Sequence, residues 1–161
     1  MFLDLEPVFN NIGARLPFAY AFVPADSGIS ESVEVSGAVE NRAGIVTLSA
    51  SVSFTHETVC DRCLKPIQVP FQKQFSHVLV QTLADEDDDE FIEVQDLHFD
   101  LDSLVREDIL LALEPKTLCK PDCKGLCPMC GADLNETACS CKKPVDPRLA
   151  VLQQLLTDEI S

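Results

Sequence analysis

Apolar and polar residues alternate through much of the first half of the chain. Three runs show this pattern, at residues 31–40, 46–54 and 67–75, and the third leads into the more continuous apolar stretch 77–80. Period-two spacing places one set of side chains on a buried face and the other in water, which is typical of β-strands. Residues 41–44 suit a hairpin turn, because Gly44 tolerates a positive φ. The pattern therefore predicts an antiparallel curled sheet or partial β-barrel of three or more strands.

Beyond residue 100 the apolar spacing becomes that of a helix. One helical stripe contains Leu101, Leu104, Val105, Ile109 and Ala112. Asp100 or Asp102 can cap this helix, and Glu114–Pro115 ends it. A C-terminal helix is expected from Asp146–Pro147. Its apolar face consists of Leu149, Leu152, Leu155 and Leu156. The predicted fold class is therefore α+β.

Composition divides the 161 residues near Pro115. Residues 1–115 carry 6 basic and 21 acidic side chains, whereas residues 116–148 carry 6 basic and 4 acidic ones together with six of the eight cysteines. This length suits one domain with a small appendage. We expect an acidic β-rich domain over 1–115 that ends in the helix. Residues 116–161 would then form a cysteine-rich, metal-binding zinc-knuckle segment and the C-terminal helix.

Strong negative charge limits the partners that the chain can bind. The formal net charge is −15, so direct and unassisted binding to nucleic acid or anionic lipid is disfavoured. A run of carboxylates has two readings, a solvated loop or a docking site for a basic partner. It comprises Asp85, Glu86, Asp87, Asp88, Asp89 and Glu90.

The cellular compartment follows from the lack of sorting signals. The first residues have neither a basic region nor an uninterrupted apolar one, and no run approaches the ~18 apolar residues of a membrane span. We therefore expect a soluble, cytoplasmic protein. Clustered thiols in that reducing compartment bind metal more often than they form disulfides.

Eight cysteines form four closely spaced pairs, two of them C-x-x-C, one C-x-x-x-C and one C-x-C. They are Cys60, Cys63, Cys119, Cys123, Cys127, Cys130, Cys139 and Cys141. Four pairs suffice for two four-thiolate sites, and such sulfur sets favour Zn(II), with an iron–sulfur cluster as the rival. Gly131 after Cys130 fits a knuckle turn that needs a positive φ. We expect two zinc ions per chain.

Two ways of sharing the ligands remain open. The last four cysteines can close a local site, which leaves Cys60 and Cys63 to join Cys119 and Cys123. Alternatively, the first pair joins Cys127 and Cys130 in a split zinc ribbon. The entropic cost of loop closure differs between the two arrangements by only about 1 kcal/mol. The free energy of binding a structural zinc ion is much larger, roughly 10–16 kcal/mol. Entropy therefore does not decide, and we prefer the local site.

The thiols fit a structural role better than a catalytic one. A redox C-x-x-C is expected at a helix N-terminus, whereas Cys60 follows a β run. Four sulfurs also leave a metal no open position. The sequence contains no arrangement of nucleophile and base, phosphate loop or paired carboxylates that indicates an enzyme. A metal-dependent redox enzyme is thus the least favoured reading.

Lysines around the later cysteines suggest RNA contact as an alternative. The candidates are Lys120, Lys124, Lys142 and Lys143. Because four thiolates around Zn(II) carry a net charge of −2, we favour the reading in which the lysines offset the charge of the metal sites. Residues 116–148 also contain no aromatic side chain on which a base could stack.

Three stretches of sequence carry a family resemblance. They are VCDRCLKP, DLDSLVREDILLALEPKTLCKPDCKGLCPMCGADLN and DPRLAVLQQLL. With them the chain resembles the YceD family, described as large ribosomal RNA subunit accumulation proteins, and residues 100–141 are the most specific block. All four cysteine pairs match the family pattern by position. Some members lack the CPMC cluster, which implies that the first four cysteines make a self-sufficient site.

The resemblance implies a role in large-subunit biogenesis rather than a known reaction. An acidic protein that affects rRNA levels is more plausible as a partner of basic proteins than of phosphate. We therefore expect a non-enzymatic factor that engages a basic ribosomal protein or a pre-ribosomal particle, with structural zinc. An RNA-binding module that uses the lysine-rich zinc segment is the alternative.

Overall fold

A computed structural model describes residues 1–25, 28–82 and 91–141. The chain divides into two compact units. The first combines Met1–Thr58 with Pro66–Thr117, and the second combines Val59–Lys65 with the chain from Leu118 onward. A short hairpin tip from the first half of the sequence thus belongs to the cysteine-rich unit.

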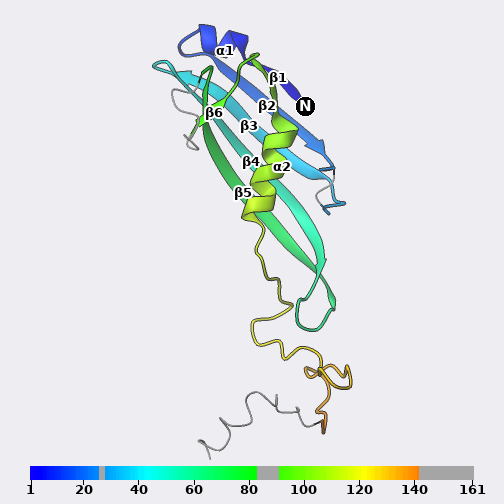
Figure 1. The fold of residues 1–161 in the computed structure, drawn as a ribbon. Helices are drawn as coiled ribbons and strands as arrows, with labels where there is room; N and C mark the ends of the chain where they lie inside the picture. Colours follow the sequence, from blue (N-terminus) through cyan, green and yellow to red (C-terminus); the bar gives the residue numbers. More distant parts are fainter. Residues whose placement is uncertain (26–27, 83–90, 142–161) are drawn as a thin grey trace, which may run out of the picture. The chain divides into compact units, whose positions relative to one another are not determined.

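The first unit is a curled, open sheet with a helix on one face (Figure 1). Its five strands, in spatial order, are β2 (Arg15–Phe22), β3 (Val33–Arg42), β4 (Ile45–Val59), β5 (Pro66–Val80) and β6 (Phe91–Glu93). A separate antiparallel pair consists of β1 (Phe2–Asp4) and β7 (His98–Asp100). The helices in the described residues of this unit are α1 (Glu6–Asn10) and α2 (Leu101–Ala112). The α+β class is therefore confirmed.

The three predicted strands are present as β3, β4 and β5. The predicted turn joins β3 to β4, with Arg42 paired to Ile45 and left-handed φ values of +54° at Ala43 and +89° at Gly44. β4 and β5 extend beyond the alternating runs, as far as Val59 and Pro66. The first cysteine pair consequently lies in the loop between these two long strands.

Helix α2 closes the core of the first unit. Leu101, Val105 and Ile109 repeat every four residues and are all fully buried, as the helical stripe predicts. Of the two candidate caps, Asp100 is the N-cap, since its carboxylate accepts the backbone N–H of Asp102 at 3.2 Å. The helix ends at Ala112, just before the predicted stop at Glu114–Pro115.

The expected antiparallel sheet is wrong at one edge, because β6 pairs parallel to β5, with Val78 opposite Phe91. Period-two spacing shows which side chains are buried but not in which direction a neighbouring strand runs. The structure also adds β2, which pairs with β3 along its whole length. Gly37 of β3 is required, because a Cβ there would lie 2.0 Å from the Ser49 carbonyl oxygen of β4 and 2.8 Å from the Phe18 ring of β2.

Asn41 is a buried polar side chain that ties α1 to the β3–β4 turn. It is only 2% exposed. Its side-chain amide donates to the Val8 carbonyl at 2.8 Å, and its carbonyl oxygen accepts the Gly44 N–H at 3.0 Å. Both polar ends of the side chain are thus satisfied inside the fold.

Several predicted features lie outside the described residues. They are the acidic run Asp85–Glu90, Lys142, Lys143 and the C-terminal helix from Asp146. Within the described part of the chain, no helix is long and apolar enough to cross a membrane.

Candidate metal centres

The C-x-x-C turn at the β4–β5 hairpin tip has a well-defined backbone geometry. The Cys60 N–H donates to the Lys65 carbonyl at 2.9 Å, and the Leu64 N–H donates to the Cys60 carbonyl at 2.8 Å. Leu64 closes the turn with a left-handed φ of +59°. These bonds hold the intervening backbone in a tight loop with the two cysteine side chains on it.

The second C-x-x-C turn repeats this geometry. The Cys127 N–H donates to the Ala132 carbonyl at 2.8 Å, and the Gly131 N–H donates to the Cys127 carbonyl at 2.9 Å. Gly131 has the predicted positive φ, +72°. Two segments far apart in the sequence therefore form the same knuckle.

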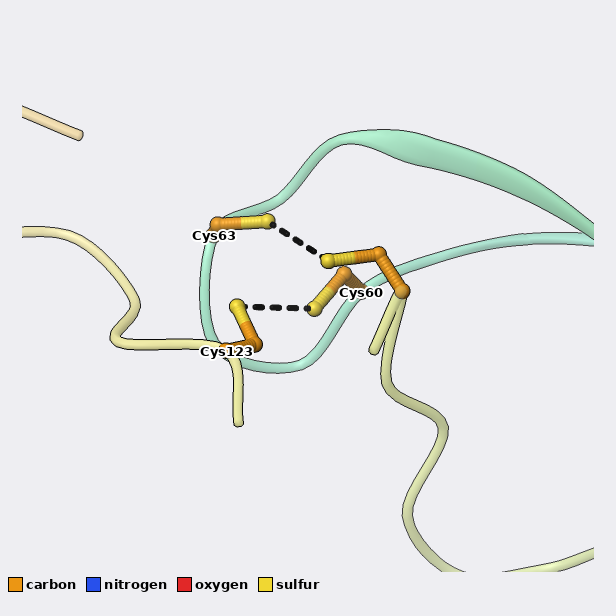
Figure 2. A group of neighbouring side chains, drawn as sticks. Cys60, Cys63 and Cys123 are labelled. Atoms are coloured by element: carbon orange, nitrogen blue, oxygen red, sulfur yellow. Dashed lines mark hydrogen bonds between the residues drawn. The ribbon is translucent and has the colours of Figure 1, made fainter. Parts of the chain in front are cut away.

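Four cysteines converge at the hairpin tip to form what we call centre 1. It contains Cys60, Cys63, Cys119 and Cys123, whose sulfurs all lie within 4.8 Å of one another. Figure 2 shows Cys60 and Cys63 on the tip loop, with Cys123 approaching from a separate segment of the chain. The Sγ–Sγ distance is 3.8 Å between Cys60 and Cys123 and 3.6 Å between Cys63 and Cys119.

These distances suit a shared metal ion rather than a disulfide. A disulfide has an S–S bond of about 2.05 Å, and all eight cysteines are free. Around zinc, with Zn–S near 2.3 Å, a regular tetrahedron places its sulfurs about 3.8 Å apart. Centre 1 is therefore already close to the geometry of a four-thiolate metal site.

Backbone N–H groups stabilise a thiolate at the first cysteine of each knuckle. Burial raises the pKa of Cys60, but the N–H groups of Cys119, Cys63 and Arg62 outweigh it and lower that pKa to about 6. For Cys127, the N–H groups of Cys130 and Met129 lower the pKa, also to about 6. The charged form is the one that binds metal, so each turn favours the ligand form of its leading cysteine.

The remaining four cysteines form centre 2. Cys127, Cys130, Cys139 and Cys141 also hold their sulfurs within 4.8 Å of one another. This grouping is the local arrangement preferred from the sequence. The two centres differ in exposure: centre 1 buries all but Cys119, whereas centre 2 buries only Cys127.

The backbone between the two centres is held against the hairpin tip. The Leu126 N–H donates to the Arg62 carbonyl at 3.0 Å, and the Arg62 guanidinium donates to the Cys123 carbonyl at 2.6 Å. Gly125 allows this approach, because it has a φ of +76° and a Cβ there would lie 2.9 Å from the Arg62 carbonyl oxygen.

A polar group that the sequence analysis did not identify surrounds Cys123. The Asn135 amide donates to the Cys123 sulfur at 3.5 Å and to the Asp133 carboxylate at 2.7 Å. Lys65 forms ion pairs with Asp133, at 3.0 Å, and with Glu136. The Asn135 backbone N–H and then Lys65 lower the pKa of Asp133 to about 2. No motif spacing marks these residues, which come together only in the fold.

The two described lysine candidates remain in solvent. Lys120 and Lys124 are exposed, and within the described part of the chain neither forms an ion pair with a carboxylate. Lys65, by contrast, is occupied by two carboxylates. Lys120 and Lys124 could therefore contact a partner without breaking an ion pair seen in the described residues, whereas Lys65 could not.

Together, the fold and the two centres define a cysteine-rich α+β protein with two groups of four thiols that could hold metal ions. The family model described as "Large ribosomal RNA subunit accumulation protein YceD" matches residues 48–156. The chain belongs to this family.

Curated relatives share about a third of their residues with the chain. An uncharacterized protein of Mycobacterium tuberculosis (strain H37Rv) is 31% identical over 125 residues, which cover 75% of this chain and 60% of the relative. YlbN of Bacillus subtilis, also uncharacterized, is 31% identical over 131 residues, covering 79% and 76%.

One plant relative has a descriptive name. It is the "Large ribosomal RNA subunit accumulation protein YCED homolog 1, chloroplastic" of Zea mays, 32% identical over 142 residues, which cover 68% of this chain and 48% of the relative. The chain thus spans between half and three quarters of the length of these proteins. No solved structure matches it significantly.

Proposed function

We propose that this protein is a non-enzymatic factor in the biogenesis of the large ribosomal subunit, acting in the cytoplasm with two structural zinc ions. Its membership of a family described by large-subunit rRNA accumulation carries the ribosomal part of the proposal. The two four-thiol centres carry the metal part.

The donor set supports zinc in a structural role. Each centre offers four sulfurs, and the Sγ–Sγ distances of centre 1, 3.6 and 3.8 Å, fit tetrahedral Zn–S bonds. Zinc bound by four protein thiolates has no open position for water or substrate. An ion at centre 1 would hold the Val59–Lys65 tip to the chain after Leu118, and an ion at centre 2 would close the 127–141 segment.

Charge supports a basic partner. The chain carries a formal charge of −15, and each four-thiolate zinc site adds about −2 relative to neutral thiols. A basic ribosomal protein, free or on a pre-ribosomal particle, would be attracted over a distance of about 10 Å at moderate salt. The acidic run Asp85–Glu90 is the proposed docking segment.

Complementation tests the role in ribosome assembly. In cells that lack this protein, the wild-type chain should restore the ratio of large-subunit to small-subunit rRNA, and a Cys60→Ser variant should fail. Ser140→Ala, an exposed neighbour of two centre 2 ligands, is the matched control and should complement. An unchanged rRNA ratio in cells without the protein would refute the role.

A second experiment separates protein docking from RNA binding. Exposed Lys120 and Lys124 favour RNA contact as the alternative. Amide substitutions of Asp85–Glu90 should slow association with pre-ribosomal particles at low salt, whereas Lys120→Gln with Lys124→Gln should leave it unchanged. The reverse result, with naked rRNA fragments bound and a salt dependence corresponding to two or more phosphate contacts, would favour the RNA-binding function.

A further inference from the structure

We propose that the two metal centres load cooperatively, because Asn135, which lies between two ligands of centre 2, positions a ligand of centre 1. This inference rests on the proposed metal role of the eight cysteines and extends it. Asn135 acts as a positioning residue, since it touches the Cys123 sulfur and would not touch the metal.

The loop that carries Asn135 belongs to centre 2 by its chain connections. It runs from Gly131 to Ala138, directly between Cys130 and Cys139. A metal bound at centre 2 therefore fixes both ends of this loop. Without that metal, the loop is held by the ion pairs of Lys65 and by hydrogen bonds, among them Cys127 N–H to the Ala132 carbonyl at 2.8 Å.

The same loop reaches centre 1 through one amide. The Asn135 Nδ2 group donates to the Cys123 sulfur at 3.5 Å, while its Oδ1 accepts the Lys124 N–H at 2.9 Å. These bonds orient Cys123 from both the side chain and the backbone. A hydrogen bond to a ligating thiolate stabilises its negative charge and holds its direction.

Lys65 provides a second connection between the centres. It follows Cys63 by two residues and forms ion pairs with Asp133 and Glu136, both in the centre 2 loop. Asp133 in turn accepts the backbone N–H and the side-chain amide of Asn135, at 2.9 and 2.7 Å. The centre 2 loop is therefore attached to both halves of centre 1, at the hairpin tip and at Cys123.

Backbone hydrogen bonds also join the centre 2 loop to the segment that follows Cys123. The Leu134 N–H donates to the Gly125 carbonyl at 2.9 Å, and Leu126 forms an antiparallel bridge with Asp133. Since Leu126 also donates to Arg62 of the hairpin tip, one short segment contacts both centres. Ordering the loop by metal at centre 2 thus prepares centre 1.

Thermodynamic linkage fixes the form of the coupling. Loss of a residue that hydrogen-bonds to a metal ligand typically lowers the metal affinity about 10–100-fold. Metal at centre 2 should raise the affinity of centre 1 by a factor in this range, and metal at centre 1 must raise the affinity of centre 2 by the same factor.

Native mass spectrometry of the wild-type chain gives the first test. Apo protein is titrated with Zn(II), and the chains with zero, one and two ions are counted. At the point of the titration where each chain holds one ion on average, two independent centres would leave at least about half of the chains with exactly one ion. Cooperative loading should push this fraction well below half. A one-ion fraction of half or more would overturn the proposal without any variant.

Variants then test the route of coupling. Co(II) affinity of centre 1, followed by the sulfur-to-cobalt absorption, should fall about 10–100-fold both in Cys139→Ser/Cys141→Ser and in Asn135→Ala. Combining all three substitutions should cost no more than either change alone. Thr137→Ala, whose hydroxyl donates to the Asp133 carbonyl at 3.2 Å, is the matched control and should have little effect.

The outcomes separate this inference from the metal role itself. Fewer than two ions bound by the wild-type chain would refute the two-centre function. Two ions bound independently, or additive effects of Asn135→Ala and the centre 2 serines, would leave that function intact and refute only the coupling.

Discussion

Leu64 and Gly131 occupy the same position in two knuckles, and both have a left-handed backbone, with φ values of +59° and +72°. In each turn this residue donates its N–H to the carbonyl of the leading cysteine. A left-handed φ costs a residue with a Cβ about 1–2 kcal/mol. Leu64 gains little packing in return, because its side chain is 62% exposed. The hairpin-tip knuckle is therefore the more strained of the two.

Exchanging these residues should move stability in opposite directions. Leu64→Gly should stabilise the metal-loaded protein by about 0.5–1 kcal/mol, since relief of strain exceeds the added freedom of the unfolded chain. Gly131→Leu should destabilise it by about 1–2 kcal/mol, for conformational reasons alone, because nothing lies within 4 Å of a Cβ there. Denaturant unfolding measures both. A destabilised Leu64→Gly protein would show that the leucine has a packing role.

Gly125→Ala should weaken centre 1 more than its φ alone requires. The left-handed backbone costs about 1–2 kcal/mol, and the new Cβ would meet the Arg62 carbonyl oxygen at 2.9 Å. We expect a total destabilisation of centre 1 of about 2–4 kcal/mol. A chelator titration measures it, because the variant should release its metal at a lower chelator concentration. Gly44→Ala has a similar φ of +89° in open space and should leave metal retention unchanged.

Asn41→Ala should destabilise the first unit by about 1–3 kcal/mol, because it leaves the buried Val8 carbonyl without its donor. Equilibrium unfolding followed by far-ultraviolet circular dichroism measures this loss. Arg42→Ala, at the adjacent and largely exposed position, should change stability by no more than about 0.5 kcal/mol. Equal effects at the two positions would refute the role of Asn41 as a tie.

Tyr20, the only tyrosine in the chain, should resist ionisation. Burial and then the nearby Asp102 carboxylate raise its pKa above the ordinary value of 10.0. A raised pKa in the folded state means that its contribution to stability is fully present below pH 10 and is lost as the pH rises above it. The phenolate absorption should therefore appear together with unfolding. Asp102→Asn should move it to lower pH, and an unperturbed titration in folded protein would contradict the burial.

Removal of metal should unfold the second unit selectively. The sheet and α2 have their own apolar core, in which Leu48, Val52 and Ile109 are fully buried. In the described part of the second unit, the buried hydrophobic side chains are the cysteines Cys60, Cys63, Cys123 and Cys127. Chelation should abolish amide protection at 59–65 and 118–141 and leave that of β3 and β4 in place. Global unfolding on chelation would show that the sheet itself depends on the metals.

Much of the fold could be predicted because burial imposes a visible period. The alternating runs gave β3, β4 and β5, and the four-residue repeat of Leu101, Val105 and Ile109 gave α2. The same alternation is present in β2, at Leu16, Phe18, Tyr20 and Phe22, and could have identified that strand. The three-residue strands β1, β6 and β7 are too short to show a period.

The cysteines of the candidate centres could be predicted from the sequence, but the polar residues around them could not. Cysteine spacing identifies the eight thiols, since pairs of metal ligands carried on one tight turn are typically only a few residues apart. It contains no information on Asn135 or Lys65, whose roles depend on chain segments that meet only after folding. The choice between the two ligand pairings could not be made from the entropy of loop closure either, because its cost differs too little between them.

Centre 1 also has a consequence for the timing of synthesis. Cys63 and Cys119 are 56 residues apart, so at about 5–20 residues per second the ribosome needs roughly 3–11 s to make the second after the first. Throughout that interval the growing chain has a hairpin whose tip bears two thiols without their counterparts. A chain interrupted before Cys119 can form strands but cannot close the centre. If centre 1 binds metal as proposed, metal capture at the tip would distinguish nascent chains that have reached Cys123 from those that have not.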